Sequence, residues 1–462
     1  MMAQFGRTRQ IHFVGVGGIG MSGIAELLVN LGYGVSGSDA KRTELTDRLA
    51  RLGVRVAIGH DAANLGEADV VVVSSAVKAD NPEVVAARHR HVPVIPRAEM
   101  LAELMRLRFG VAIAGAHGKT TTTSMVALML ERAGLDPTAV IGGRLSAFGS
   151  NARLGRGNLM VVEADESDRS FLKLTPSIAV ITNIDREHME AYGTFERLLD
   201  AFVDFADKVP FYGAVVACID DPNVRAMLPR LSRRVITYGF SQDADVRGVN
   251  ATTDGRGGRC DVMQGVLTVG VPGLHNLQNA LAAVAVGLEL GVSFDRIAPA
   301  LAEFGGADRR YQFKGEINGV TVVDDYGHHP TEIAAVLRAA RSGSPRRVVA
   351  VFQPHRYSRT RDLLAEFGRV LAAADVTLLT EIYPAGEAPI PGITASAIAE
   401  AIRAHGRGTV ELVPSLDGLA ARAAEIALDG DVLLTLGAGS IGAVSDKIVA
   451  ALQARAAQAV QR

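Results

Sequence analysis

Short apolar runs alternate with longer amphipathic segments along most of this chain. In the first hundred residues, strand-like runs at 11–14, 34–37 and 70–74 are separated by helical patterns at 22–31 and 44–52. Strands that alternate with helices are typical of βαβ units, in which helices cover a parallel sheet. The pattern therefore predicts an α/β fold.

Two breaks divide this alternation. A helical segment at 97–109 leads into a new apolar strand, and residues 304–315, FGGADRRYQFKG, have the composition of a linker. The 462 residues are enough for about three domains. We predict a Rossmann-like N-terminal domain (1–107), a central P-loop ATPase-type domain with a mostly parallel sheet (108–306) and a Rossmann-like C-terminal domain (307–462). Further strands are expected at 159–163, 178–183, 320–323, 347–352, 376–380 and 432–436, and a surface β meander at 235–267.

Charge and cysteine content narrow the class of protein. Forty-eight basic and 50 acidic side chains leave a net charge of -2, so we expect no nucleic acid partner. No apolar run reaches the roughly 18 residues of a membrane span, so we expect no membrane partner either. The two cysteines, Cys218 and Cys260, cannot form a disulfide framework, which favours a reducing compartment and a cytoplasmic location.

The clearest chemical signal lies at residues 109–130, FGVAIAGAHGKTTTTSMVALML, where an apolar strand, a tight glycine turn and a helix follow one another. A helix N-terminus presents unpaired N–H groups and a positive dipole to phosphates. Lys119 would add a point charge, and the Thr120 hydroxyl would hold Mg²⁺. Gly115 precedes Gly118 by three positions, so the loop is a shorter variant of the usual P-loop. The alternative is a glycine turn with a solvated lysine.

A second phosphate-binding pattern opens the chain. Gly15, Gly17 and Gly20 have GxGxxG spacing directly after a strand, and Asp39 ends the next strand. Small residues let a diphosphate approach a helix N-terminus, but this does not distinguish NAD from a nucleotide sugar. The same glycine spacing recurs at 437–442, where close packing is the preferred interpretation.

Polar residues follow two central strands. Glu163 ends an apolar strand in VVEADESDRSFL, and His188 follows the next one in SIAVITNIDREHMEAYG. Strand ends open on the ligand crevice of α/β sheets, where carboxylates can hold Mg²⁺. A metal or phosphate contact is therefore predicted for both residues, whereas the acidic residues at 165–168 fit a solvated loop equally well. A long apolar helix is expected from Asn276, which is either a helix cap or a ligand contact.

Two polar turns stand out in the last third of the chain. VVDDYGHHPTEIAAVL places Tyr326 and His328 between a strand and a helix, and VFQPHRYSRTRDLL offers Arg356 and Arg359 after another strand. Guanidinium groups suit carboxylates and phosphates. We interpret Arg361 as a solvated residue.

Seven segments, in chain order, resemble motifs of the Mur ligases: GVGGIGMSGIAELL, GAHGKTTTTSM, EADESDRSFL, TNIDREHMEAYG, GLHNLQNALAA, DDYGHHPTEI and FQPHRYSRTRDL. The similarity extends over essentially the whole chain. GVGGIGMSG is most similar to the branch of the family that adds L-alanine. The branch that recycles murein tripeptide shares the later motifs and is the alternative.

The resemblance implies a function in peptidoglycan precursor synthesis. ATP would drive amide formation between L-alanine and the carboxylate of UDP-N-acetylmuramate, through an acyl phosphate and a tetrahedral intermediate, with Mg²⁺ as cofactor. The catalytic residues that it implies are Lys119, Glu163, His188, His328 and Arg356. The metal ligands are Thr120, Glu163 and His188. The residues that the resemblance implies as ATP contacts are Gly115, His117, Gly118, Lys119, Thr120, Thr121 and Asn276. The UDP-sugar contacts are Gly15, Gly17, Gly18, Gly20 and Asp39, and the L-alanine contacts are Tyr326, His328, Arg356 and Arg359.

One departure from the wider family concerns a second metal. Several sister ligases carry a carbamoylated lysine after the metal-binding histidine, but residues 189–206 contain no lysine, and the L-alanine branch lacks it too. A second metal would then depend on Glu163 and His188. The family also implies domain closure with 304–310 as hinge. We expect a monomer or a weak homodimer.

Two alternative functions lie outside the family. An NAD-dependent oxidoreductase would use the GxGxxG patterns but leaves Gly118, Lys119 and Thr120 unexplained. A nucleotide-gated binding module would use the P-loop and hydrolyse ATP slowly.

Overall fold

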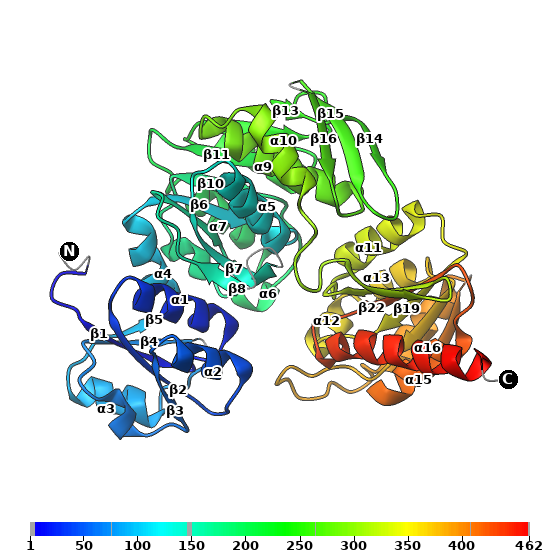
Figure 1. The fold of residues 1–462 in the computed structure, drawn as a ribbon, viewed down its shortest axis with the longest axis horizontal. Helices are drawn as coiled ribbons and strands as arrows, with labels where there is room; N and C mark the ends of the chain where they lie inside the picture. Colours follow the sequence, from blue (N-terminus) through cyan, green and yellow to red (C-terminus); the bar gives the residue numbers. More distant parts are fainter. Residues whose placement is uncertain (1–4, 75, 146–149, 264, 407, 461–462) are drawn as a thin grey trace. The chain divides into compact units, whose positions relative to one another are not determined.

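The computed structural model describes residues 5–74, 76–145, 150–263, 265–406 and 408–460, and Figure 1 shows their helices and strands. The chain forms two compact units, which are described separately. The first unit consists of Met1–Val249, Asp261–Leu267 and Gln278–Glu303, and the second of Asn250–Cys260, Thr268–Leu277 and Phe304–Arg462.

The first unit begins with a five-stranded parallel sheet in the order β3-β2-β1-β4-β5. Its strands are β1 (Gln10–Val14), β2 (Gly34–Asp39), β3 (Arg55–Ile58), β4 (Val70–Val73) and β5 (Val94–Pro96). Its helices are α1 (Ile19–Asn30), α2 (Glu44–Arg51), the 3-10 turn η1 (Ala62–Leu65), α3 (Pro82–His89) and α4 (Arg97–Arg106). The strand order reverses between β1 and β4, and ligands of such sheets bind at the carboxyl ends beside this point.

A second sheet of the first unit has eight strands in the order β13-β12-β11-β10-β6-β9-β7-β8, parallel except for the β7–β8 pair. Its strands are β6 (Phe109–Ala114), β7 (Thr138–Leu145), β8 (Ser150–Arg153), β9 (Leu159–Glu163), β10 (Ile178–Ile181), β11 (Ala214–Cys218), β12 (Val235–Gly239) and β13 (Val246–Arg247). The helices that follow these strands are α5 (Lys119–Arg132), α6 (Met189–Tyr192), α7 (Phe195–Ala206), α8 (Pro222–Met227), α9 (Leu274–Glu289) and α10 (Phe294–Ala302), with the 3-10 turns η2 (Ser170–Lys173) and η3 (Leu228–Arg230). Cys218 of this unit and Cys260 of the second unit are both buried, and no disulfide joins them.

The expected surface meander at 235–267 is wrong for its first part. β12 pairs in parallel with β11, and its Tyr238 is buried. The helix α8 lies between the two strands in the chain and allows this parallel connection. The later part does form a separate three-stranded sheet of β14 (Val249–Thr253), β15 (Gly258–Val262) and β16 (Gly265–Val269).

The second unit carries a six-stranded sheet in the order β17-β18-β22-β19-β20-β21, parallel except for the β17–β18 hairpin. Its strands are β17 (Gln312–Ile317), β18 (Val320–Asp325), β19 (Arg347–Phe352), β20 (Val376–Leu379), β21 (Thr409–Leu412) and β22 (Asp431–Leu436). Its helices are α11 (Pro330–Ser342), α12 (Tyr357–Asp362), α13 (Leu364–Leu371), α14 (Ala395–Ala404), α15 (Leu416–Ile426) and α16 (Val444–Val460), with the 3-10 turn η4 (Ser440–Ala443).

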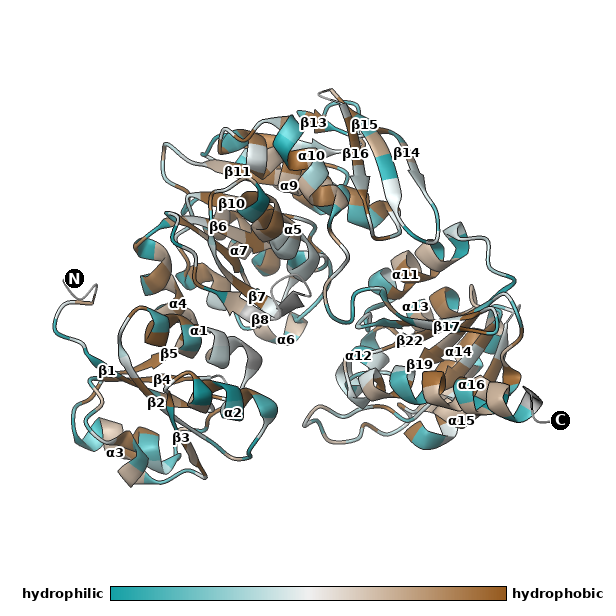
Figure 2. Cartoon of the chain, in the orientation of Figure 1, coloured by the Kyte–Doolittle hydropathy of each residue, from teal (hydrophilic) through white to brown (hydrophobic). Residues whose placement is uncertain are grey.

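Alternate residues along the C-terminal strands fill two separate cores. On β19, Ala350 and Phe352 pack with α11, α13 and α14, whereas Val349 and Val351 pack with α15 and α16. A parallel sheet buried on both faces reads as a continuous apolar run, and Figure 2 shows such strands in brown between helices with teal outer positions. The predicted α/β fold class is confirmed. Among the described residues, no helix is both long and apolar enough to cross a membrane.

The second glycine pattern, at 437–442, serves close packing. A Cβ at Gly437 would lie 2.7 Å from the carbonyl oxygen of Gln353, and a Cβ at Gly439 would lie 2.8 Å from the Gln353 side chain. Both distances are shorter than real Cβ contacts, so the turn after β22 needs small residues to lie against the end of β19.

Candidate active site

The predicted site residues fall into two groups, one in each unit. The first unit holds the N-terminal glycine turn, the P-loop and the metal-binding candidates. The second unit holds Asn276 and the tyrosine, histidine and arginine residues of the last third.

The P-loop connects β6 to α5 and requires glycine at two positions. Gly115 and Gly118 have φ angles of 136° and 80°, and a Cβ at Gly115 would lie 2.0 Å from Thr182 Oγ1. The loop is also held by the end of β10, because the His117 N–H donates to Asn183 Oδ1 at 2.8 Å. The strand, turn and helix predicted for a phosphate cradle are therefore present, and α5 begins at Lys119 as expected.

Lys119 folds back onto its own loop. Its Nζ donates to the carbonyl oxygens of Gly115 at 2.6 Å and Ala116 at 3.1 Å, and to Glu166 Oε1 at 2.9 Å. Burial opposes the charge of Lys119, but Glu166 and the neighbouring carboxylates outweigh it and raise the pKa of the lysine above its usual range. Lys119 is thus a permanent cation in a mostly buried setting, and the alternative of a solvated lysine is wrong.

Thr120 and Glu163 come together across two strands of the central sheet. Thr120 Oγ1, in the first turn of α5, donates to Glu163 Oε1 at the end of β9 over 3.1 Å. The other carboxylate oxygen, Oε2, accepts from the Gly142 N–H at 2.7 Å. A hydroxyl and a carboxylate are the hard oxygen donors that Mg²⁺ prefers, so this pair fits a magnesium site beside the P-loop.

His188 lies with a different pair of carboxylates. Glu166, Glu187 and His188 each offer a ligand atom, and these atoms all lie within 4.8 Å of one another. Glu166 is only 3% exposed, and its Oε2 has no hydrogen-bond partner among the described residues. Burial raises the pKa of Glu166 above its usual range, although Lys119 opposes this shift. The solvated-loop interpretation is therefore wrong for Glu166.

The sequence analysis assigned no role to Glu166 or Glu187. Glu166 belongs to the run of acidic residues after β9, but the spacing of that run did not distinguish the buried Glu166 from the exposed Asp168. The turn at His188, with φ of 56°, brings Glu187 and His188 back toward the acidic loop. The structure therefore brings Thr120 together with Glu163, and His188 together with two further carboxylates.

The N-terminal glycine turn lies between β1 and α1. The Gly15 N–H donates to the carbonyl oxygen of Ser38 at 2.9 Å, and the Gly17 N–H donates to Asp39 Oδ2 at 2.8 Å. A Cβ at Gly17 would lie 2.9 Å from the same carboxylate oxygen. Asp39 thus fixes the shape of the turn that contains all four predicted glycines, 15–20, and it is not a free acceptor.

In the second unit, aromatic rings form a row that includes two predicted residues. Tyr326 and His328 meet edge to face with centroids 5.4 Å apart, His328 and His355 follow at 5.7 Å, and His355 stacks on Tyr383 at 5.5 Å. Burial, together with the charges of His328 and two nearby arginines, lowers the pKa of His355 to about 4. His355 is therefore neutral at physiological pH. Tyr383 was missed because its segment carries no motif and meets His355 only in the folded chain, through a β-bridge and ring stacking.

Arginines from two segments of the chain surround this row. Arg356 adopts a left-handed conformation, with φ of 72°, directly before α12, and Arg359 Nη1 lies 3.3 Å from His355 Nδ1. Arg310 stands over the ring of Tyr326, 5.1 Å from its centroid, although the sequence analysis assigned its segment to a linker. Arg361 pairs with Asp362 on the surface, as its solvated interpretation predicted.

Asn276 lies inside the first turn of α9, because the helix begins at Leu274 and not at Asn276. Its buried Nδ2 donates to the carbonyl oxygen of Pro272 at 2.7 Å. Asn279, one turn later and in the first unit, lies against the P-loop, since a Cβ at Gly118 would be 2.7 Å from Asn279 Oδ1. The sequence analysis assigned no role to Asn279, and the structure places it beside the P-loop.

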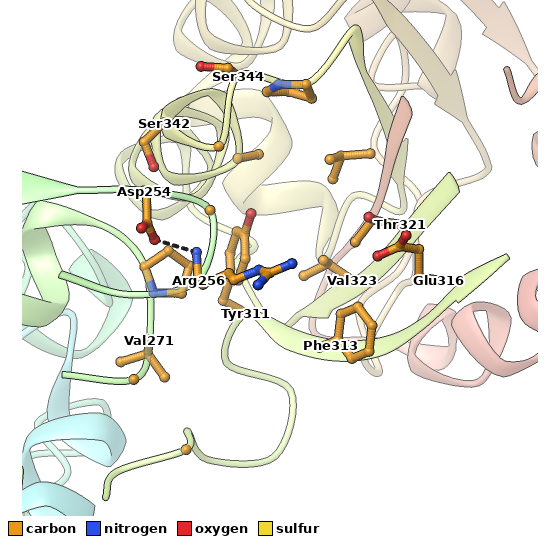
Figure 3. A pocket seen from close by; sticks show the side chains of 18 residues that line it. Asp254, Arg256, Val271, Tyr311, Phe313, Glu316, Thr321, Val323, Ser342 and Ser344 are labelled. Carbon is orange, nitrogen blue, oxygen red and sulfur yellow. Dashed lines mark hydrogen bonds between the residues drawn. The ribbon is translucent and has the colours of Figure 1, made fainter. Parts of the chain in front are cut away.

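A cavity of about 880 Å³ in the second unit is separate from these residues (Figure 3). Its lining includes Asp254, Arg256, Tyr311, Phe313 and Glu316, and none of the residues that line it is a predicted site residue. The Asp254 carboxylate accepts the Arg256 N–H of its own turn at 2.8 Å, as the dashed line in Figure 3 shows. This cavity therefore adds no residue to the candidate active site.

Comparison with known proteins identifies the family. Three family models match in chain order: the Mur ligase family catalytic domain at residues 10–109, the Mur ligase middle domain at 113–287 and the Mur ligase glutamate ligase domain at 309–439. A relative from Anaeromyxobacter sp. is 57% identical over 453 residues, which cover 97% of this chain and 99% of the relative. The chain belongs to the Mur ligase family. The resemblance inferred from the motifs is confirmed.

The names of these Mur ligase relatives are specific. The Anaeromyxobacter protein is named UDP-N-acetylmuramate--L-alanine ligase, and so is a Geobacter sulfurreducens relative that is 54% identical over 460 residues, 97% of this chain and 99% of its own. Among solved structures, the UDP-N-acetylmuramate-alanine ligase of Thermotoga maritima matches with a TM-score of 0.81 and 30% identity, over 96% of this chain and 99% of that one. The murein peptide ligase of Psychrobacter arcticus matches with a TM-score of 0.69 and 25% identity, over 96% and 98%.

Proposed function

We propose that this Mur ligase joins L-alanine to the carboxylate of UDP-N-acetylmuramate and converts ATP to ADP and phosphate, in peptidoglycan precursor synthesis. The observation that carries the proposal is the full-length identity of 54–57% to ligases of that name, in a chain that has Lys119 and Thr120 at its P-loop and Glu163 at the end of β9, bonded to Thr120. The TM-score of 0.81 to the L-alanine ligase structure, against 0.69 to the murein peptide ligase structure that covers the same share of this chain, also favours L-alanine over murein tripeptide.

The reaction needs an activated acid, because a free carboxylate would have to expel oxide. A carboxylate oxygen of the sugar nucleotide attacks the γ-phosphorus of ATP, ADP departs, and an acyl phosphate forms. The amine of L-alanine then attacks the acyl carbon to give a tetrahedral intermediate. This intermediate loses phosphate, the nitrogen loses a proton, and the amide remains.

Lys119 is the residue that most directly serves the phosphoryl transfer. It would bridge the β- and γ-phosphates at the N-terminus of α5, where Gly115, His117, Gly118 and Thr121 shape the cradle. Phosphate oxygens would replace Glu166 as partners of its ammonium group, and the positive charge would stabilise the transition state more than the ground state. Bound Mg²⁺, with Thr120, Glu163 and His188 as ligands, would supply further neutralisation of phosphate charge.

The remaining residues hold the other substrates. Gly15, Gly17, Gly18 and Gly20 would receive the UDP diphosphate, with Asp39 near the uridine. Asn276 would contact the adenine. Tyr326 and His328 would lie near L-alanine, and the guanidinium groups of Arg356 and Arg359 would bind its carboxylate. Holding three substrates in line contributes several kcal/mol as an order of magnitude, because their encounter entropy is lost at binding.

We also propose the domain boundaries near 107 and 306, a hinge at 304–310, a cytoplasmic location and a monomer or weak homodimer. The first family model ends at residue 109 and the third begins at residue 309, which supports the two boundaries.

One experiment tests the function. The protein is incubated with ATP, Mg²⁺ and UDP-N-acetylmuramate, with L-alanine, glycine, L-serine or murein tripeptide added separately, and product masses are recorded. We expect the L-alanine adduct and release of ADP that depends on both other substrates. ADP release that is no faster with the sugar nucleotide and L-alanine than with ATP alone would favour the nucleotide-gated module. A change of nicotinamide absorbance would favour the oxidoreductase.

A further inference from the structure

A buried carboxylate lies behind the N-terminal glycine turn. Glu83 is the second residue of α3, and its side chain is fully buried. Its Oε2 accepts a hydrogen bond from the Ser38 hydroxyl at 2.6 Å and lies 2.8 Å from His12 Nε2. A buried charge needs several partners, and these two satisfy only one of its oxygens.

The second oxygen, Oε1, collects a different set of donors. The Asp61 N–H lies 3.2 Å away, Asn64 Nδ2 lies 3.1 Å away, and His60 Nδ1 lies 3.2 Å away. Burial alone would raise the pKa of Glu83, but the hydrogen bonds from His12, Ser38 and Asn64 outweigh it and hold the pKa at about 2. Glu83 is therefore ionised and connects β1, the end of β2 and the turn after β3.

The residue that links Glu83 to the glycine turn is Ser38. The Ser38 hydroxyl donates to Glu83. The carbonyl oxygen of Ser38 accepts hydrogen bonds from the N–H groups of Gly15 and Val16, both at 2.9 Å. The next residue, Asp39, accepts the Gly17 N–H through its side chain and the Gly59 N–H, at 2.8 Å, through its carbonyl oxygen. A movement of the end of β2 would therefore be transmitted to the backbone of the turn.

We propose that Glu83 is a positioning residue for the sugar nucleotide: through Ser38 it fixes the end of β2 and thereby the backbone of the Gly15–Gly20 turn that receives the diphosphate. This inference rests on the proposed binding of the UDP moiety at that turn. Glu83 itself is fully buried, so it acts through Ser38 and not by contact with the ligand.

A purely structural role for Glu83 predicts a loss of stability without a specific loss of UDP affinity. A matched control is available at the far end of the same network. Ser36 Oγ lies 2.8 Å from His12 Nδ1, on the side of the histidine away from Glu83. Ser36→Ala removes one buried hydrogen bond of the network and leaves the bond between Glu83 and Ser38.

The test measures the Kd of the full-length protein for UDP by calorimetry, with the melting temperature as a second readout. For Glu83→Gln we expect affinity at least about tenfold weaker, because the cradle is no longer preorganised. For Ser36→Ala we expect a Kd within about twofold of wild type despite a lower melting temperature. A folded Glu83→Gln protein with wild-type affinity would overturn the proposal, as would an equal loss of affinity in Ser36→Ala.

The variant Ser38→Ala tests the same proposal if the Glu83→Gln protein does not fold. It removes only the hydroxyl that contacts Glu83 and keeps the carbonyl that holds the turn, so we expect UDP affinity about threefold or more weaker. In steady-state assays, the same variants should raise the KM for UDP-N-acetylmuramate with little change in the KM for ATP. Wild-type affinity of Ser38→Ala would contradict the proposal. Failure of the wild-type protein to bind UDP would instead contradict the proposed function.

Discussion

The ammonium nitrogen of Lys119 lies 2.9 Å from Glu166 Oε1, in an ion pair whose carboxylate is 3% exposed and whose lysine is 15% exposed. The residue proposed to bridge the phosphates of ATP is therefore already paired with an acid from the loop after β9. Because the pair is buried, removal of either partner leaves the other charge poorly compensated. This relationship leads to the first prediction.

Lys119→Ala should lower turnover by about 100-fold or more, because the charge that stabilises phosphoryl transfer is lost. Affinity for UDP-N-acetylmuramate should be retained. Rapid-quench measurement of ADP formation, with calorimetry for the sugar nucleotide, checks both statements. Near wild-type turnover would remove Lys119 from its proposed role.

Glu166→Gln tests the pair from the other side. Without its main carboxylate partner, the pKa of Lys119 should fall toward the ordinary lysine value, since Glu166 is the first of the charges that raise it. The neutral amine then becomes accessible at a lower pH. Mass spectrometry after acylation at pH 9 should show faster modification of Lys119 in the variant, with ATP giving protection. Equal rates in both proteins would show that the pair does not control the lysine.

Thr120 and Glu163 predict a specific magnesium effect. Thr120→Val keeps the side-chain shape but removes the hydroxyl oxygen, so the Mg²⁺ concentration for half-maximal ADP formation should rise about tenfold. Thr120→Ser keeps the oxygen and serves as the matched control, with a value near wild type. If both variants required the same Mg²⁺ concentration, Thr120 would not be a ligand.

Arg356 and Arg361 form a second matched pair. Arg356→Ala should raise the KM for L-alanine by about tenfold or more, because a guanidinium bond to the carboxylate is lost. Arg361 pairs with Asp362 at the surface, so Arg361→Ala should leave the KM unchanged. Steady-state kinetics with varied L-alanine distinguishes the two. An unchanged KM in Arg356→Ala would argue against the carboxylate contact.

The acid stability of the N-terminal sheet should depend on Glu83. Its folded pKa of about 2 lies below the ordinary 4.5, so ionised Glu83 stabilises the fold above pH 4.5 and loses this effect as the pH falls toward 2. The difference in urea midpoint between wild type and Glu83→Gln should therefore shrink from pH 6 to pH 3. A constant difference across that range would show that the charge of Glu83 is not what stabilises the fold.

The motifs located the P-loop and the glycine turn correctly, because both depend on local backbone geometry. Gly115 and Gly118 adopt positive φ angles that other residues avoid, and such a requirement is visible in the residue type itself. The position of β12 was missed because a short, half-polar strand gives the same periodicity in a surface meander as in a parallel sheet.

The sequence by itself determined the α/β class, the family and the position of the P-loop lysine, since these follow from periodicity and from residue types at fixed spacing. Only the tertiary structure decided that Glu166 is buried against Lys119, that His188 meets Glu166 and Glu187, and that Glu83 lies behind the glycine turn. Each of these groups joins residues from separate loops or strands. Their burial, and hence their charge state, depends on how those segments pack, which local sequence does not specify.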